Sequence, residues 1–176
     1  RDPADVEAAF ARIDTLDVLV NSAGVGGNAS LVEGDLDDWR AMLEVNVLAL
    51  AQCTRLAVAT MRANGDTGQI VHISSMSGHR TVCYAGMYAA SKFAVQAMTE
   101  GLRLELRALG SRIRVASIAP GVVDTRFGLA PDEPDKERPW QMLTPDDVAR
   151  SVLHVVEAPA HVHIGDILLR PTEQPN

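Results

Sequence analysis

A tyrosine and a lysine four positions apart are the residues of this chain best suited to chemistry. Tyr88 and Lys92 lie in the stretch "SSMSGHRTVCYAGMYAASK", which covers residues 74–92. Side chains at this spacing lie on one face of a helix. An ammonium beside a phenol favours the phenolate and lowers the phenol pKa from its usual value of about 10. The pair is therefore suited to general acid–base catalysis, and a surface tyrosine packed on a lysine stem is the alternative that the spacing alone leaves open.

Ser75 stands thirteen residues before Tyr88, at the end of an apolar stretch that predicts a strand. Its hydroxyl is able to hold a substrate carbonyl beside the phenol. A serine that bonds its own backbone in a turn is the alternative. We expect Ser75, Tyr88 and Lys92 to meet at one site.

The elements that must position these residues follow from the apolar pattern. Strands are expected over residues 16–24, 68–75, 113–121 and 163–171, and helices over residues 35–65, 88–110 and 144–159. Strands that alternate with helices of this length form parallel β–α–β units. The predicted fold class is α/β, a doubly wound parallel sheet of the Rossmann type, in a single domain over residues 1–176.

Ligands of such sheets bind beyond the carboxyl ends of the strands. The first three predicted strands end at Asn21–Gly24, Ser74–Ser75 and Pro120–Gly121. We expect these segments to meet in one crevice. The polar, proline-rich stretch Leu129–Trp140 is predicted to be an exposed loop over that crevice.

Composition indicates a soluble globular protein. The chain has 176 residues, of which 47% are hydrophobic and 22% charged, and its net charge is −7. An acidic chain without a basic stripe is a poor partner for nucleic acid, and no apolar run approaches the roughly 18 residues of a membrane span. Cys53 and Cys83 are too few for a disulfide framework. We expect a cytoplasmic protein with neither a nucleic-acid nor a membrane partner.

The motifs occur in an order and spacing that resemble the short-chain dehydrogenase/reductase family. They are Asn21-Ser-Ala-Gly24, Asn46 in "EVNVLAL", Ser75, Tyr88-Ala-Ala-Ser-Lys92 and Pro120-Gly-Val-Val-Asp-Thr125. The set covers essentially the whole chain and is far more specific than Tyr-x-x-x-Lys alone. The resemblance implies an enzyme that interconverts a secondary alcohol and a ketone by hydride transfer with a nicotinamide cofactor.

The resemblance also implies a role for each matching residue. Tyr88 would protonate the carbonyl oxygen during reduction or take the alcohol proton during oxidation. Lys92 would lower the pKa of Tyr88 and hydrogen-bond the nicotinamide ribose, and Ser75 would orient the substrate. Asn46 would kink its helix and hold a water molecule that links Lys92 to solvent. A polar residue on a helix flank is the alternative for Asn46.

Two loops would contact the cofactor by the same resemblance. The loop after the first strand would approach its adenosine side, and the loop after the third strand would contact its nicotinamide end, where the backbone of Val123 would hold the carboxamide. Besides Tyr88 and Lys92, the residues concerned are Asn21, Ala23, Gly24, Pro120, Gly121, Val123 and Thr125. Asn-Ser-Ala-Gly stands here where the family usually has Asn-Asn-Ala-Gly, a mild departure.

The stretches "SMSGHR", "LTPDDVARSV" and "IGDILLRPTEQ" resemble an NADP-dependent cytosolic branch of the family. The resemblance implies NADP as cofactor, with NAD as the alternative, and a small carbonyl or alcohol substrate. Members of that branch act on 3-hydroxy acids and serine or reduce 3- and 17-ketosteroids. The alanine-rich faces of residues 35–65 and 88–110 resemble the family's dimer surface, so a homodimer or homotetramer is expected; ordinary core-facing stripes explain part of that apolarity.

One glycine-rich stretch imitates a dinucleotide-binding motif. Gly24–Ala29 fits the loose pattern Gly-x-Gly-x-x-Ala, but Asn28–Gly34 predicts a loop where a helix should open, and Glu44 falls inside a helix. The family's phosphate-binding loop, Thr-Gly-x-x-x-Gly-x-Gly, does not occur. We therefore expect the chain to be the C-terminal two thirds of the domain, with an apolar edge on its first strand and weak dinucleotide binding by itself. A non-catalytic fragment, such as a scaffold or oligomerisation module, is the alternative function.

The histidines and the second tyrosine predict little chemistry by themselves. His161 and His163 have no third ligand nearby, so no metal site is expected. His72 and His79 are expected to pack or to face solvent, and lining the crevice is the alternative for His79. Tyr84 is predicted to form a wall of the substrate site.

Overall fold

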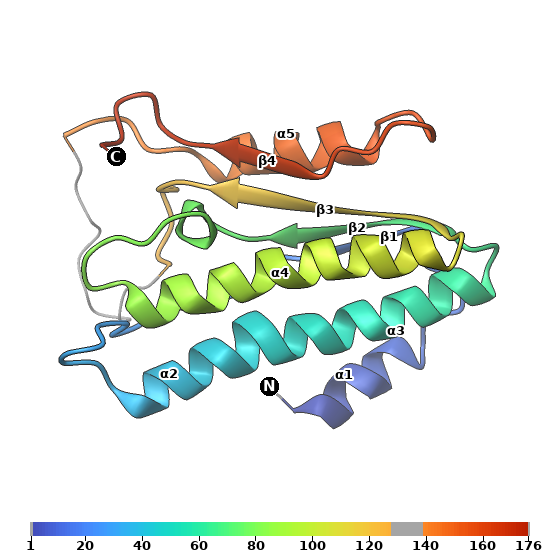
Figure 1. The fold of residues 1–176 in the computed structure, drawn as a ribbon, viewed down its shortest axis with the longest axis horizontal. Helices are drawn as coiled ribbons and strands as arrows, with labels where there is room; N and C mark the ends of the chain where they lie inside the picture. The colour runs from blue at the N-terminus through green and yellow to red at the C-terminus, as the bar shows by residue number, and fades with distance from the viewer. Residues whose placement is uncertain (1, 128–138, 176) are drawn as a thin grey trace.

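The computed structural model describes residues 2–127 and 139–175, and its centre is a parallel sheet. Strands β1, β2, β3 and β4 lie side by side in chain order (Figure 1). Adjacent strands pair in parallel throughout. The predicted parallel α/β sheet is confirmed, with the strands at Val18–Asn21, Thr67–Ile73, Arg112–Pro120 and Asp166–Leu169.

Helices cover both faces of this sheet. The helices are α1 (Pro3–Phe10), α2 (Leu36–Leu43), α3 (Leu50–Ala63), α4 (Gly86–Ala108) and α5 (Pro145–Val156), with a π-helical segment η1 (Glu44–Ala49) and a short 3₁₀ turn η2 (Met76–Gly78). Figure 1 shows α2, α3 and α4 along one face and α5 along the other. The long helix predicted over residues 35–65 is therefore α2, η1 and α3 in succession.

Alternation along the strands explains the two layers. Ile70 and Val115 pack with residues of α3 and α4. Their neighbours Val71 and Ala116 point the opposite way and pack with Val155 of α5. Because side chains on a strand alternate between faces, a continuous apolar run such as that of β3 buries both faces at once.

Helix boundaries fall where the sequence predicts them. The Asp35 carboxylate accepts hydrogen bonds from the backbone of Asp37 and Asp38 at the start of α2. Thr144 and Asp147 form a reciprocal capping box at the start of α5. After α4 the chain turns at Gly110, whose φ of +67° favours glycine. These caps set the directions in which the loops leave the site.

The helix over Leu36–Ala63 corrects one expectation. By length and composition it is apolar enough to cross a membrane, contrary to the prediction that no such segment exists. Core helices of globular proteins meet the same criterion. Ala57 and Met61 of this helix are fully buried in the cluster that also holds Ile70 of the sheet, so the helix packs as part of the core.

Strand β1 lies at the edge of the sheet. Val18 and Val20 are 37% and 40% exposed, because β1 pairs with β2 alone and forms the edge of the sheet. The expected apolar edge is therefore present. The loop expected over Leu129–Trp140 falls almost entirely outside the described residues.

Candidate active site

The carboxyl ends of the strands meet at a cavity of about 890 Å³, as predicted. Most of the predicted site residues line it, and they come from the loops after β1, β2 and β3 and from the first turns of α4. The lining includes Gly24, Ser75, Tyr88, Lys92, Pro120, Gly121, Val123 and Thr125. Asn21, Ala23 and Asn46 do not line the cavity.

Lys92 is buried beside the end of β2. Its ammonium donates a hydrogen bond of 3.0 Å to the Ile73 carbonyl, and only 4% of the residue is exposed. Burial lowers the Lys92 pKa from its usual value to about 8, because a charge is less stable away from water. The chain therefore holds a cation where the hydrophobic effect alone would favour an apolar side chain.

Tyr88 lies against this lysine on α4. The Lys92 nitrogen is 5.8 Å from the centroid of the Tyr88 ring. Burial raises the Tyr88 pKa, and the hydrogen bond with the Ser75 side chain acts in the opposite direction. The prediction that the Tyr88 pKa is lowered is therefore wrong for this structure. Desolvation of the phenolate raises the pKa by more than the Ser75 side chain lowers it.

Ser75 both bonds the backbone of its own turn and faces the cavity, so the two alternatives for this residue hold together. Its hydroxyl oxygen accepts a hydrogen bond of 3.1 Å from the Ser77 backbone, as a turn serine would. The Ser75 side chain also acts on the Tyr88 phenol, whose pKa it lowers. Ser75, Tyr88 and Lys92 thus come together as one group at the cavity.

Asn46 lies behind this group, in the π-helical segment η1. A π-helical segment is an irregularity within a longer helix, and Asn46 lies inside it. The Asn46 amide exchanges two hydrogen bonds with the backbone of Val25, of 2.8 Å and 3.0 Å. It also donates to the Ser91 hydroxyl, which in turn donates to the Tyr88 carbonyl. Asn46 therefore joins the loop after β1 to the helix that carries Tyr88.

Gly24 is at the closest approach between this loop and the site. A β-carbon placed on Gly24 would lie 3.4 Å from the Asn46 side-chain oxygen and 3.7 Å from the Lys92 nitrogen. The loop residue therefore sits within contact distance of both. Ala23, two positions beyond the strand end, is exposed and contacts neither the cavity nor this group among the described contacts.

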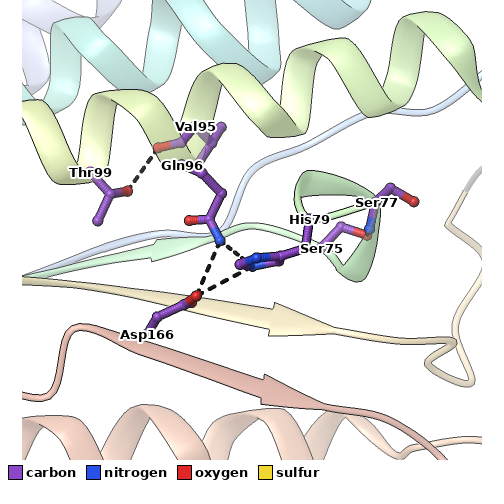
Figure 2. Close-up of polar contacts among 7 residues, drawn as sticks. All are labelled: Ser75, Ser77, His79, Val95, Gln96, Thr99 and Asp166. Atoms are coloured by element: carbon purple, nitrogen blue, oxygen red, sulfur yellow. Dashed lines mark hydrogen bonds and ion pairs between the residues drawn. The ribbon is translucent and has the colours of Figure 1, made fainter. Parts of the chain in front are cut away.

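Asn21 starts a chain of hydrogen bonds beneath the cavity. Its amide donates to the Thr54 hydroxyl at 3.0 Å, and Thr54 lies 3.1 Å from His72 Nε2. His72 Nδ1 lies 2.9 Å from the Thr99 hydroxyl, which donates to the Val95 carbonyl (Figure 2). Since the Thr99 proton is used, Nδ1 carries a proton and Nε2 accepts one from Thr54. Burial lowers the His72 pKa to about 4, which keeps this neutral form.

The loop after β3 presents free backbone groups to the cavity. The Val122 carbonyl and the Asp124 N–H pair with Leu143, and the Val122 N–H donates to the Gln174 side-chain oxygen at 2.9 Å. Within residues 2–127 and 139–175, the N–H and C=O of Val123 have no hydrogen-bond partner. A free donor and acceptor side by side at a cavity fit a carboxamide such as that of nicotinamide.

Three contributors to the site had no role assigned from the sequence. Phe127 packs its ring 5.7 Å from that of Tyr88, at 57°. Gln174 reaches back from the C-terminal end of the chain to the cavity, and Ser91 links Asn46 to α4. Ser91 lies inside the Tyr-x-x-Ser-Lys motif and Gln174 ends the stretch "IGDILLRPTEQ", so both positions carried a usable signal. Nothing in the sequence pattern indicates Phe127.

Tyr84 and the histidines lie away from the cavity. Tyr84 is 74% exposed and is absent from the cavity lining, so its predicted role as a wall is wrong. His72 packs in the core, one of the two expected outcomes. His79 is half-buried outside the cavity. His163 contacts the Val115 carbonyl at 2.9 Å. Within the described part of the chain, no three His, Cys, Asp or Glu residues form a group able to hold a metal ion.

The chain is similar to curated oxidoreductases. A protein-family model described as "short chain dehydrogenase" matches residues 2–134. Human dehydrogenase/reductase SDR family member 11 is 44% identical over 168 residues, which cover 90% of this chain and 65% of the human protein. The chain thus spans about two thirds of the length of this relative.

Solved structures agree with the family match. The closed form of a serine dehydrogenase complexed with NADP⁺ has a TM-score of 0.92 and 29% identity, covering 99% of this chain and 74% of that one. A metagenomic short-chain oxidoreductase in complex with NADP has a TM-score of 0.74 and 28% identity, covering 98% and 69%. The sheet is thus the Rossmann-like sheet of these enzymes, and the chain belongs to the short-chain dehydrogenase/reductase family.

Proposed function

We propose that the whole protein interconverts a secondary alcohol and a ketone with NADP(H). The observation that carries this proposal is the grouping of Ser75, Tyr88 and Lys92 at one cavity, where the Ser75 side chain also lowers the Tyr88 pKa. A phenol and a hydroxyl that converge on one space suit a substrate with a single polar oxygen. The apolar side chains of Val148 and Val152, which also line the cavity, suit a carbon skeleton beside it.

Reduction of a ketone consumes one hydride and one proton. The nicotinamide, when bound, supplies the hydride. Tyr88 supplies the proton to the carbonyl oxygen, and in the reverse direction its phenolate takes the alcohol proton. The raised Tyr88 pKa keeps the phenol protonated at neutral pH, which is the form needed for reduction. Ser75 holds the same oxygen by donating a hydrogen bond.

Lys92 has two tasks in this proposal. Its ammonium lies behind the Tyr88 ring and offers protons that the Ile73 carbonyl does not use, which suits a bond to the ribose of the cofactor. It also favours the phenolate once Tyr88 has given up its proton. Asn46 fixes the loop after β1 beside Lys92, and a water molecule held there would return a proton from solvent.

The cofactor contacts proposed for this chain lie at two loops. Val123 would hold the carboxamide through its free backbone groups, with Pro120, Gly121 and Thr125 beside it. The loop Asn21–Gly24 would approach the adenosine side. NADP is proposed over NAD because the two solved structures compared above are complexes with NADP.

The experiment that tests this function uses the full-length protein. A panel of ketones, hydroxy acids and steroids is assayed with NADPH and with NADH by following the nicotinamide absorbance. The proposal expects consumption of NADPH by at least one ketone, with a matched alcohol oxidised in reverse. Tight binding of NADPH without turnover of any alcohol or ketone in the panel would contradict it.

We further propose that the protein is cytoplasmic and forms a homodimer or homotetramer through α3 and α4. Phe93 and Leu104 are 46% and 52% exposed on α4. They are eleven positions apart, about three helical turns, and so lie on one face. An apolar face of this kind is suited to a second copy of the chain.

A further inference from the structure

The turn that carries Ser75 is tied together by its own hydrogen bonds. Ser75 is the N-cap of η2, and its hydroxyl accepts from the Ser77 backbone. The Gly78 N–H donates to the Ser75 carbonyl at 2.8 Å, and the His79 N–H donates to the Met76 carbonyl at 3.1 Å. Because the turn is one bonded unit, whatever holds its far end also holds the hydroxyl of Ser75.

Gly78 brings this turn directly against α4. A β-carbon on Gly78 would lie 2.8 Å from the Lys92 carbonyl oxygen and 2.8 Å from the Ser74 hydroxyl oxygen. Such distances leave no room for a side chain. The turn therefore rests on the backbone of the helix at the level of Lys92.

His79 ends the turn and reaches away from the cavity. Its Nε2 atom lies 3.3 Å from Asp166 Oδ2, and it also contacts the amide nitrogen of Gln96. The Gln96 nitrogen is 3.5 Å from the same Asp166 oxygen, so the three side chains close a triangle (Figure 2). Asp166 begins β4 and Gln96 lies one helical turn beyond Lys92 on α4. Nε2 carries either a proton for Asp166 or a lone pair for the Gln96 amide, so it bonds one of the two at a time. Because Gln96 and Asp166 also contact each other, His79 fastens the turn to a pair of side chains that links β4 and α4.

We infer that His79 is a positioning residue, which fixes Ser75 by fastening its turn to β4 and α4. The inference rests on the proposed function, in which Ser75 orients the substrate. His79 does not line the cavity and touches no reacting atom. It acts through the turn: the Ser74 N–H bond of 2.7 Å to the Ile118 carbonyl fastens the start of the turn, and the triangle fastens its end.

The exposure of the triangle sets the size of the expected effect. The side chains of His79 and Asp166 are 29% and 38% exposed, so water weakens their attraction. We expect His79→Ala to lower kcat with the carbonyl substrate by about fivefold, while the dissociation constant for NADPH stays unchanged. A residue that served only overall stability would not separate these two quantities.

The test compares three variants in the full-length protein. His79→Ala should lower kcat, and His79→Gln should restore it to within about twofold of wild type, because a glutamine amide reaches the position of Nε2. His161→Ala is the control, since His161 is exposed and lies at the opposite end of the sheet. Equal kcat in His79→Ala and the control, or no rescue by His79→Gln, would overturn the inference.

Hydrogen exchange separates this inference from the proposed function. In the full-length protein, exchange of the Ser77 and Gly78 N–H groups should accelerate in both His79→Ala and Asp166→Ala. The double variant should exchange no faster than His79→Ala, because His79→Ala already removes both contacts that His79 makes in the triangle. If no substrate is turned over, the proposed function fails, while the exchange rates still show whether His79 holds the turn that carries Ser75. Unchanged exchange in both single variants would contradict it.

Discussion

Burial shifts the pKa values of both Tyr88 and Lys92 from their usual values. The Tyr88 pKa is raised, and the Lys92 pKa is lowered to about 8. Each shift favours the neutral form, so the site holds a protonated phenol beside a lysine whose charge burial destabilises. Perturbed values of this kind concentrate at functional sites because catalysis needs groups that exchange protons near neutral pH.

Ser75 and its neighbour Ser74 give a residue-scale prediction. Ser75→Ala removes a donor aimed at the substrate oxygen, so kcat in the full-length protein should fall on the order of a hundredfold. It also removes the hydrogen bond that lowers the Tyr88 pKa. Ser74→Ala should leave most of kcat, because the buried Ser74 hydroxyl has no partner among the described residues. Steady-state kinetics of the two variants measure this, and the reverse order of effects would contradict the assignment.

At the scale of elements, hydrogen bonds between side chains join β1, α3, β2 and α4 through His72. Figure 2 includes the Thr99 end of this chain. The sequence left open whether His72 packs or faces solvent, and its partners Thr54 and Thr99 lie 18 and 27 positions away in the chain. Such pairings depend on how helices lie on the sheet, which local patterns do not specify.

The His72 pKa leads to a pH prediction. Its folded value of about 4 is below the usual value of 6.5, so the unfolded chain binds the proton first as pH falls. The stabilising contribution is complete above pH 6.5 and is lost as pH falls from there to about 4. The loss is at most on the order of 3 kcal/mol.

Denaturant unfolding at about pH 7, 5 and 4, which together span this pH window, measures the loss. The wild-type chain should lose more free energy of unfolding across the window than His72→Gln, which has no titrating ring. The comparison uses the slopes with pH, since the substitution also changes the stability at neutral pH. Parallel slopes would show that His72 does not carry the dependence.

At the scale of the whole molecule, the parallel sheet, the helix positions and the apolar edge of β1 were predictable, while contacts between distant segments were not. Alternating apolar segments and helix caps predicted the parallel sheet and the crevice at its carboxyl end. The approach of Gln174 to Val122 joins segments 52 positions apart.

The exposed face of α4 gives the prediction for assembly. Leu104→Glu places a charge on the face that also carries Phe93, so the full-length protein should shift to a smaller oligomer. Light scattering after size-exclusion chromatography measures the mass. Val32→Glu is the matched control, because it makes the same apolar-to-acid change at a residue that is 87% exposed and lies outside α3 and α4. An unchanged mass in Leu104→Glu would place the interface elsewhere.

The central claim is that the Tyr88 phenol carries the proton in the reaction. Tyr88→Phe keeps the ring beside Phe127 and removes only the hydroxyl, so the fold should be retained. Turnover of the full-length variant with NADPH should fall by about a thousandfold, while NADPH binding, followed by calorimetry, stays close to wild type. If turnover of Tyr88→Phe stayed within about tenfold of wild type, a change in activation free energy of about 1.4 kcal/mol or less, the account would be contradicted.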